Sequence, residues 1–390
     1  MEKVKSRKGK SLIFIPCNLH WEWSTDYINQ TAYQLAKNGN TVICYLYLDT
    51  EYLKDCIRNR KFPRLIQNPH KNLFLVTPFY FIPMRRFNFI KSLNFYLNLF
   101  ILNSFMFLKN FFGSFERKIL WIFDPNIIPE LKIKKSDSYL IYDCVDFFAV
   151  GTKENIIKTK RNERILCEKS DLVVANSKVL KKYLEHYRKR VVLVPQGFRA
   201  VGFEVKKSKY IDLKLKGPVI GFVGGINNRL DTKLIKQLAL KNKDWNFVLW
   251  GPLQKDINTG FGREKQIRDI LNLPNVYTGE SKDKEEIPSL ITQFDVGMIP
   301  YDISQDFNKY CYPMKVFEFF YLGKPVISTG IEELKRFPKL VHIGDSFNEW
   351  QKILERLLSE KYSRNNVLAM KKLSLENSWE NKVNAIEKEI

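Results

Sequence analysis

Short apolar runs alternate with helical patterns along this chain, and this alternation restricts its fold more than any other feature. Ser11 to Cys17 is an apolar run, the helical pattern Tyr27 to Lys37 follows, and Thr41 to Leu48 is the next apolar run. Strand, helix and strand in this order form the unit of a parallel sheet covered by helices. Ligands bind beyond the carboxyl ends of such strands. The loop at residues 18–24 is therefore expected to face a cleft.

This loop carries two polar side chains between aromatic ones. His20 and Glu22 flank Trp21, and Trp23 follows. The pattern suits an acceptor-binding site made of His20, Trp21 and Glu22. A loop that is only anchored by its aromatic side chains remains an equal interpretation.

Length and composition set the class of protein. A chain of 390 residues is long for one core and suits two domains. Its hydrophobic content of 45% excludes a disordered protein. The net charge of +22 predicts attraction to something anionic, which leaves nucleic acid, an acidic lipid surface and a phosphorylated substrate open.

Cysteine spacing and the start of the chain bear on its compartment. None of the six cysteines forms a Cys-x-x-Cys pair, so the sequence predicts neither a zinc site nor a disulfide framework, and a reducing cytoplasm fits best. The first ten residues are basic, but the apolar run Ser11 to Ile15 is shorter than a signal peptide requires. We therefore expect no export.

Residues 81–118 are rich in aromatic and basic side chains. The uncharged part, Ser92 to Leu108, is interrupted by asparagines and is shorter than the roughly 20 residues of a spanning helix. One interpretation is an amphipathic segment that contacts an anionic membrane surface. The other is that the aromatic side chains cover the N-terminal sheet.

Two further buried-strand patterns, Lys118 to Asp124 and Tyr139 to Cys144, each end in a polar turn. Asp146 follows the second, beside two phenylalanines. A partly desolvated carboxylate at a strand end could orient an acceptor hydroxyl or accept its proton. The alternative is that Asp146 caps the next helix, which the pattern places from about Glu163.

A glycine pair opens the second half of the chain. The strand Gly217 to Val223 leads to Gly224 and Gly225, then to Arg229 and the helix Thr232 to Leu240. Glycines allow close approach to a phosphate, and Arg229 offers a fork of donors for a diphosphate. Lys233 is a second candidate cation. A simple turn is the other interpretation of the glycine pair.

A short aromatic helix is predicted from Pro313 to Gly323, and a buried strand follows it directly. Glu318 lies among its apolar residues, and a carboxylate in that setting needs a partner. The partner is either Lys315, three residues earlier, or the hydroxyl groups of a ligand. Free N–H groups near Pro313 would then face an anion.

The order Pro313-x-Lys315-x-x-Glu318, followed by Gly323-x-Pro325-Val326, resembles the nucleotide-sugar motif of the GT-B glycosyltransferases, near their family 4. The resemblance implies an α/β fold of two doubly wound Rossmann-like domains that face a central cleft. The acceptor-binding domain would span residues 1–198, the hinge 199–216 and the nucleotide-sugar domain 217–371. A last helix, about 372–390, would pack back on the first domain.

The resemblance also assigns roles in the second domain. Glu318 would bind the ribose of the donor, and Arg229 with Lys233 would stabilise the departing diphosphate. The donor-binding set is Gly224, Gly225, Arg229, Tyr277, Thr278, Tyr310, Pro313, Met314, Lys315 and Glu318. Two positions depart from the family: Tyr310 stands where a second glutamate often touches the sugar, and Asp146 stands nearest to the place of a histidine.

These features predict a glycosyltransferase that moves a hexose from a nucleotide-diphosphate sugar to a glycan or lipid-linked acceptor in cell-surface polysaccharide biosynthesis. By resemblance we expect retention of anomeric configuration and no metal or other cofactor. The protein would be cytoplasmic and peripheral on the inner face of the cell membrane if residues 81–118 contact lipid. Two alternatives remain: a catalytically silent GT-B scaffold, and a nucleic-acid-binding or nucleic-acid-modifying protein, for which no motif is recognised.

Overall fold

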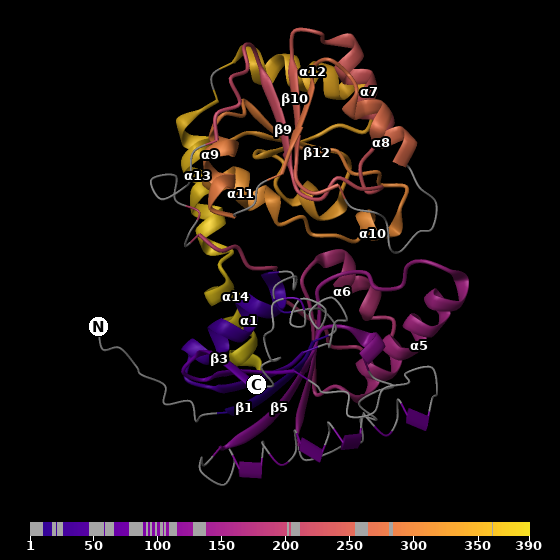
Figure 1. Cartoon of the computed structure of the whole chain (residues 1–390), viewed down its shortest axis with the longest axis vertical. Coiled ribbons are helices and arrows are strands. Elements are labelled where there is room, and N and C mark those ends of the chain that lie inside the picture. The colour runs from indigo at the N-terminus through magenta and orange to yellow at the C-terminus, as the bar shows by residue number, and fades with distance from the viewer. Residues whose placement is uncertain are drawn as a thin grey trace.

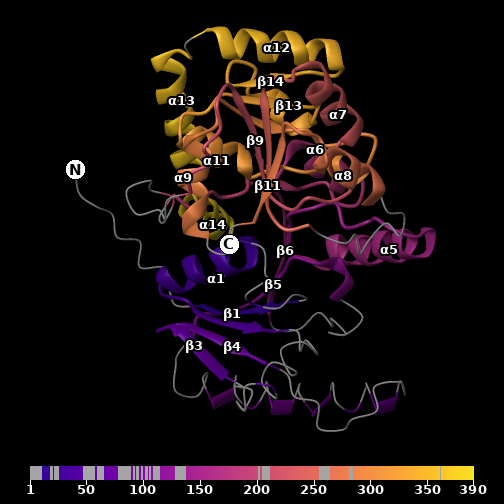
Figure 2. The same ribbon diagram turned by 45° about the horizontal axis from the view of Figure 1, so that its top comes forward.

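Two twisted sheets, each covered by helices, organise the computed structural model of the chain (Figure 1; Figure 2). The structure describes residues 11–17, 21, 26–46, 58, 66–77, 89, 90, 93, 96, 97, 100, 101, 104, 107, 108, 115–127, 138–200, 203, 211–253, 264–280, 284–360 and 362–390. Within these residues the first sheet has eight strands and the second has six. The predicted α/β class with two doubly wound sheets is confirmed.

The first sheet has the strand order β3-β4-β2-β1-β5-β6-β7-β8, and its neighbours are parallel except for β3 and β4. Its strands are β1 (Ser11–Pro16), β2 (Thr41–Tyr45), β3 (Ile66–His70), β4 (Leu73–Val76), β5 (Arg117–Ile122), β6 (Tyr139–Cys144), β7 (Leu172–Ala175) and β8 (Val192–Leu193). The helices of this part are α1 (Asp26–Lys37), the 3-10 turn η1 (Pro125–Ile127), α5 (Lys153–Lys169) and α6 (Lys178–Leu184). The direction of winding reverses between β1 and β5, which places a ligand-binding crevice there.

The second sheet is parallel throughout, in the order β11-β10-β9-β12-β13-β14. Its strands are β9 (Val219–Val223), β10 (Asn246–Trp250), β11 (Val276–Gly279), β12 (Val296–Ile299), β13 (Val326–Ser328) and β14 (Val341–Ile343). The helices around it are α7 (Thr232–Lys241), α8 (Glu264–Leu271), η3 (Lys284–Glu286), α9 (Ile287–Thr292), α10 (Asp306–Lys309), α11 (Lys315–Tyr321), η4 (Glu332–Arg336), α12 (Phe347–Ser359) and α13 (Arg364–Glu376). Here the winding reverses between β9 and β12.

The centre of the second sheet depends on a glycine. All five residues of β9 are buried, as expected of a strand with helices on both faces. A Cβ atom on Gly221 would lie 2.2 Å from the ring of Phe294, which occupies that space. Glycine at this position therefore allows the phenylalanine ring to pack directly on the strand.

The last helix, α14 (Trp379–Glu389), returns to the first sheet (Figure 1). Its buried side chains Trp379, Val383 and Ile386 join the core between that sheet and α1. Ser378 caps the helix, since its side chain accepts from the N–H of Asn381. The chain therefore passes between the two domains at 198–211 and again near Asn377.

Contacts across the boundary hold the two domains together. A carboxylate oxygen of Glu333, in η4, accepts from the backbone N–H of Lys178 at 2.8 Å, at the start of α6. The rings of Phe147 and Tyr310 stack with centroids 4.5 Å apart. At the chain crossing, the N–H of Phe198 donates to the carbonyl of Asn377 at 2.6 Å.

Most of the aromatic and basic segment, residues 81–118, lies outside the described residues. The described positions between 89 and 108 are helical, and Phe89, Phe100 and Phe107 are 74%, 71% and 68% exposed. For these three side chains the prediction that they cover the N-terminal sheet is therefore wrong. No helix within the described part of the chain is both long enough and apolar enough to span a bilayer.

Candidate nucleotide-sugar site between the domains

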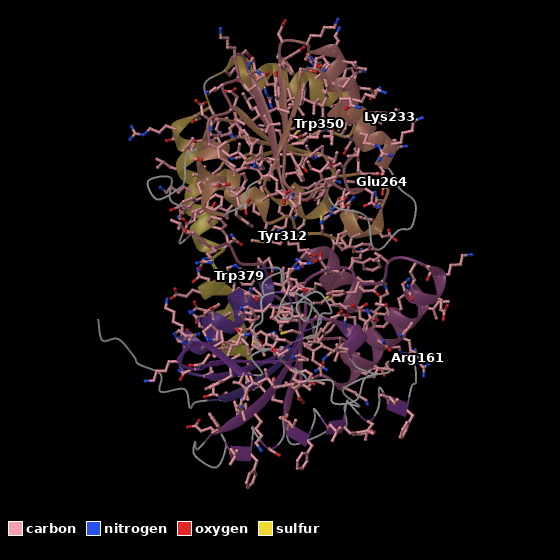
Figure 3. The ribbon with its side chains drawn as sticks, in the orientation of Figure 1. Arg161, Lys233, Glu264, Tyr312, Trp350 and Trp379 are labelled. Atoms are coloured by element: carbon pink, nitrogen blue, oxygen red, sulfur yellow. The ribbon has the colours of Figure 1, made fainter. Side chains whose placement is uncertain are left out.

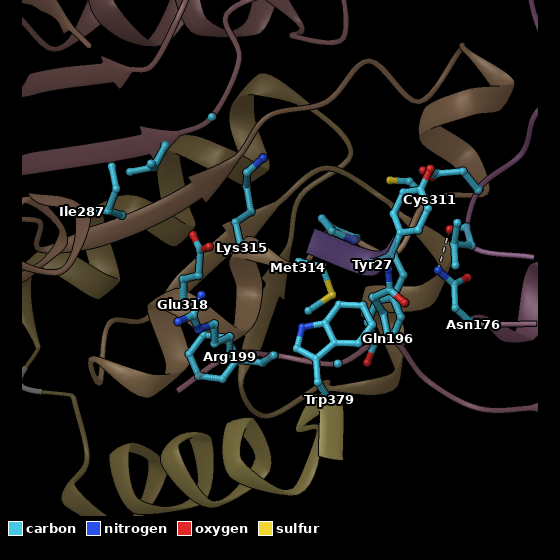
Figure 4. A pocket seen from close by; sticks show the side chains of 18 of the residues that line it. Tyr27, Asn176, Gln196, Arg199, Ile287, Cys311, Met314, Lys315, Glu318 and Trp379 are labelled. Carbon is cyan, nitrogen blue, oxygen red and sulfur yellow. Dashed lines mark hydrogen bonds between the residues drawn. The ribbon is translucent and has the colours of Figure 1, made fainter. Parts of the chain in front are cut away.

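A cavity of about 740 Å³ lies between the two domains, at the carboxyl ends of both sheets (Figure 4). Its first-domain wall follows β6 and β8 and includes Asp146 and Gln196. Its second-domain wall follows β9 and β12 and extends to the start of α11. Of the predicted site residues, the cavity brings together Asp146, Gly224, Arg229, Pro313, Met314, Lys315 and Glu318.

Two cations converge on one tyrosine in the second-domain wall. The Arg229 guanidinium carbon lies 4.2 Å from the ring centroid of Tyr301, and the Lys315 ammonium donates to the Tyr301 hydroxyl at 2.6 Å. The Nε–H of Arg229 donates to Asn308, a fully buried residue, at 2.8 Å. These contacts fix both cations at the cavity, where they can face an anionic ligand.

The direction of the Lys315 side chain bears on whether Lys315 is the partner of the Glu318 carboxylate. Lys315 extends away from the Glu318 carboxylate and toward Tyr301 (Figure 4). The interpretation of Glu318 as a simple ion-pair partner of Lys315 is therefore wrong, and both side chains line the cavity. The helix that carries them, α11, begins at Lys315, two residues after the predicted start.

Gly224, the first residue of the glycine pair, lies close to Lys315. Gly224 has a φ of +142°, and a Cβ atom there would lie 2.8 Å from the Lys315 nitrogen. Its own N–H donates to the carbonyl of Trp250. Gly224 therefore makes room for the lysine, while its amide is already used within the sheet. Gly225 is the next residue and does not line the cavity.

Asp146 lies on the opposite wall, just after β6. Burial raises the pKa of its carboxyl to about 6, although the positive charge of Arg229 acts to lower it. The residue that caps α5 is Thr152, whose side chain accepts from the N–H of Asn155, so the prediction that Asp146 caps that helix is wrong. The carboxylate thus faces the cavity with a pKa near neutrality, as proton-transfer groups often do.

Several predicted residues lie elsewhere. Lys233 is on α7, on the outer side of the second domain and beside a different cavity (Figure 3). Tyr277 and Thr278 lie on the edge strand β11 and do not line the cleft cavity. Tyr310 stacks on Phe147 instead of lining the cavity.

The predicted acceptor loop is described at one residue only. Trp21 packs against the core of the first domain, with its ring 6.1 Å from that of Tyr33, and does not line the cavity. His20 and Glu22 lie outside the described residues.

Many further residues line or support the cavity, among them Tyr27, Tyr301, Asn308, Cys311 and Trp379. Tyr301 could have been found from its place two residues after the end of β12, at the carboxyl end of a strand. Asn308 carries no sequence signal of its own, since its role depends on the packing of α10 against Arg229.

No protein-family model matches the chain. It is 31% identical over 239 residues to TuaH of Bacillus subtilis (strain 168), a proposed teichuronic acid biosynthesis glycosyltransferase. The match spans 57% of this chain and 58% of that relative, so it covers little more than half of either protein.

Solved structures match over almost the whole chain. Sucrose-phosphate synthase from Thermosynechococcus elongatus superposes with a TM-score of 0.72 at 14% identity, covering 97% of this chain and 98% of that one. HepE from Anabaena, in complex with UDP-glucose, gives a TM-score of 0.63 at 11% identity, covering 97% and 100%. The GT-B fold that the motifs implied is thereby confirmed for this chain.

Proposed function

We propose that this protein is a glycosyltransferase that takes a sugar from a nucleotide diphosphate and passes it to a hydroxyl group of a glycan or lipid-linked acceptor. The observation that supports this most is the arrangement of Arg229 and Lys315 around Tyr301, on the wall opposite Asp146. The similarity to TuaH and to the UDP-glucose complex of HepE points to the same reaction and donor class.

In the proposed reaction, the bond between the anomeric carbon and the diphosphate breaks, and the acceptor oxygen forms a bond to that carbon. The diphosphate leaves with the electron pair, and the two cations stabilise its charge. We assign Lys315 the part that the sequence analysis gave to Lys233. Glu318 would bind the ribose hydroxyls, and Asp146 would orient the acceptor hydroxyl or receive its proton. We further propose a hexose as the sugar, retention of its configuration and no need for a metal ion.

A screen of nucleotide sugars by thermal shift tests the donor. A ligand that binds only the folded protein raises the melting temperature by mass action, so the donor is expected to stand out. Transfer or donor hydrolysis should then fall sharply in Arg229→Met, Lys315→Met and Glu318→Gln. Lys233→Met, on the outer face of the same domain, is the matched control and should keep wild-type activity. Equal activity in all four variants would contradict the assignment of Arg229, Lys315 and Glu318 to the donor-binding site.

We also propose that the exposed aromatic side chains near residues 89–108 contact an anionic membrane. Phe89, Tyr96, Phe100 and Phe107 are each helical and exposed, and they recur at spacings of seven, four and seven residues, which is the spacing of residues on one side of a helix. Large exposed apolar stripes often mark a membrane or protein contact. The basic composition of the chain favours an acidic lipid surface as the partner.

Co-sedimentation with vesicles tests this contact. The protein is expected to bind phosphatidylglycerol vesicles at low salt, to bind phosphatidylcholine vesicles far less, and to be released by salt. Phe100→Ser with Phe107→Ser should weaken binding. Leu240→Ser with Leu368→Ser, which changes two exposed apolar residues of the second domain, is the matched control. Wild-type binding that survives the phenylalanine changes would refute this surface.

A further inference from the structure

A buried ion pair lies beneath the first-domain wall of the cavity. The Lys382 ammonium, on α14, is 3.1 Å from a carboxylate oxygen of Asp143 at the end of β6, and both side chains are fully buried. The same ammonium donates to the side-chain oxygen of Gln196 at 3.0 Å. Three segments that are far apart in the sequence thus meet at one nitrogen atom.

This contact sets the orientation of the Gln196 amide. A lysine ammonium has only donors, so the atom of Gln196 that faces it must be the oxygen. The NH2 group then lies on the other side of the amide. Gln196 borders the cavity, and within the described residues its NH2 group donates to no protein atom. The amide can therefore offer N–H donors to a ligand.

Contacts with Asn377 and Trp379, at the start of α14, also fix the loop that carries Gln196. A Cβ atom on Gly197 would lie 2.5 Å from the indole ring of Trp379, so the ring packs directly on the backbone there. The N–H of Phe198 donates to the carbonyl of Asn377. The start of α14 and the loop after β8 therefore cannot shift independently of each other.

We propose that the Gln196 amide is a hydrogen-bond donor for the hydroxylated acceptor, and that Lys382 and Asp143 are positioning residues that hold it in place. The inference rests on the proposed function and adds an acceptor contact to it. Gln196 belongs to the wall that carries Asp146, across the cavity from Arg229 and Lys315. A sugar hydroxyl bound by the amide would thus lie on the side of the proposed base and away from the diphosphate.

The test compares three variants with wild-type protein, using the donor found by thermal shift and a panel of octyl hexosides as acceptors. Gln196→Met removes the N–H donors at similar side-chain length. Lys382→Met with Asp143→Leu removes both buried charges together, so neither is left unpaired. The third variant combines all three changes. Donor hydrolysis in the absence of a hexoside serves as the internal measure of donor binding.

We expect Gln196→Met to raise KM for the hexoside about fivefold to tenfold, the size of one hydrogen bond, and to leave KM for the donor unchanged. The charge-pair variant should give a similar increase, and the triple variant should add little, because the residues act as one unit. Gln196→Met remains decisive if the charge-pair variant fails to fold.

An unchanged hexoside KM in Gln196→Met would overturn the inference while leaving the proposed function intact. If the increases in hexoside KM caused by Gln196→Met and by the charge-pair variant add fully in the triple variant, Lys382 and Asp143 do not act through Gln196, and their positioning role is refuted. If the wild-type protein neither hydrolyses the donor nor uses any hexoside, the proposed function fails and this inference fails with it.

Discussion

At the scale of single residues, Asp146 is the group whose protonation should govern activity. Burial raises the pKa of its carboxyl to about 6, so the carboxylate form is lost as the pH falls through that value. If Asp146 acts on the acceptor, kcat/KM should rise with pH to a plateau above about pH 7. Asp146→Asn should lower it at least about 100-fold, as loss of a general base does.

Rate measurements from pH 5 to 8 check this prediction. The positive charge of Arg229 lowers the pKa of Asp146, so the midpoint should move to higher pH in Arg229→Met, measured on whatever activity remains. A pH-independent rate in the wild-type protein would exclude the role of Asp146.

Glu163 is a buried acid outside the cavity, and its role concerns stability. Its carboxylate accepts from the hydroxyls of Tyr142 and Tyr183 at 2.6 and 2.7 Å. Burial raises its pKa above the usual 4.5, and these hydrogen bonds only partly oppose that effect. The folded state therefore holds this proton more tightly than the unfolded state. The contribution of Glu163 to stability falls as the pH rises from about 4.5 through the raised pKa.

Glu163→Gln should therefore gain stability relative to wild type as the pH rises, because the amide never has to ionise in the core. Glu163→Ala removes the carboxylate that accepts from two tyrosine hydroxyls and should cost about 2–3 kcal/mol. Urea unfolding at pH 5 and at pH 8 measures both. The prediction fails if the difference between wild type and Glu163→Gln does not depend on pH.

At the scale of elements, β9 is the strand most sensitive to added volume. A Cβ atom on Gly221 would lie 2.2 Å from the Phe294 ring, so Gly221→Ala should lower the free energy of unfolding by about 1–3 kcal/mol. Gly221→Ala with Phe294→Leu should recover part of that loss, since the smaller side chain makes room. Urea unfolding of the single and double variants measures the recovery, and a purely additive loss would contradict the steric cause.

The elements that sequence reasoning predicted well are those bounded by sharp changes in polarity. Strand β6 has the predicted bounds, Tyr139 to Cys144, because its mostly apolar run lies between polar residues. Helix α5 begins at Lys153, ten residues before the expected start. Its first two turns are mostly exposed and polar, so they show no apolar periodicity. Thr152, a residue type that often caps helices, is the sequence signal that marks the true start.

The same limit applies to the candidate site. The motif around Lys315 and Glu318 was found because its spacing is local to one helix. Lys233 is only four residues from Arg229 in the sequence, but α7 carries it to the outer face. The contact of Lys382 with Asp143 joins residues 239 positions apart, and no pattern along the chain records it.

At the scale of the whole molecule, the stack of Tyr310 on Phe147 is a direct contact between the two domains. An aromatic pair contributes about 0.5–1.5 kcal/mol beyond its buried area. Tyr310→Ala should therefore raise the ratio of open to closed molecules about twofold to tenfold. Small-angle X-ray scattering should report a larger radius of gyration, while Tyr310→Phe, which keeps the ring, should match wild type. An unchanged radius in Tyr310→Ala would mean that other contacts set the closure.

The return of α14 to the first sheet makes the first domain discontinuous in the gene. A fragment that stops near residue 198 would contain the described strands of the first sheet. It would lack α14, so the apolar surface on which Trp379, Val383 and Ile386 pack would be exposed to solvent. Such a fragment is expected to aggregate. Soluble expression of this lobe alone would need the last eleven-residue helix attached through a short linker.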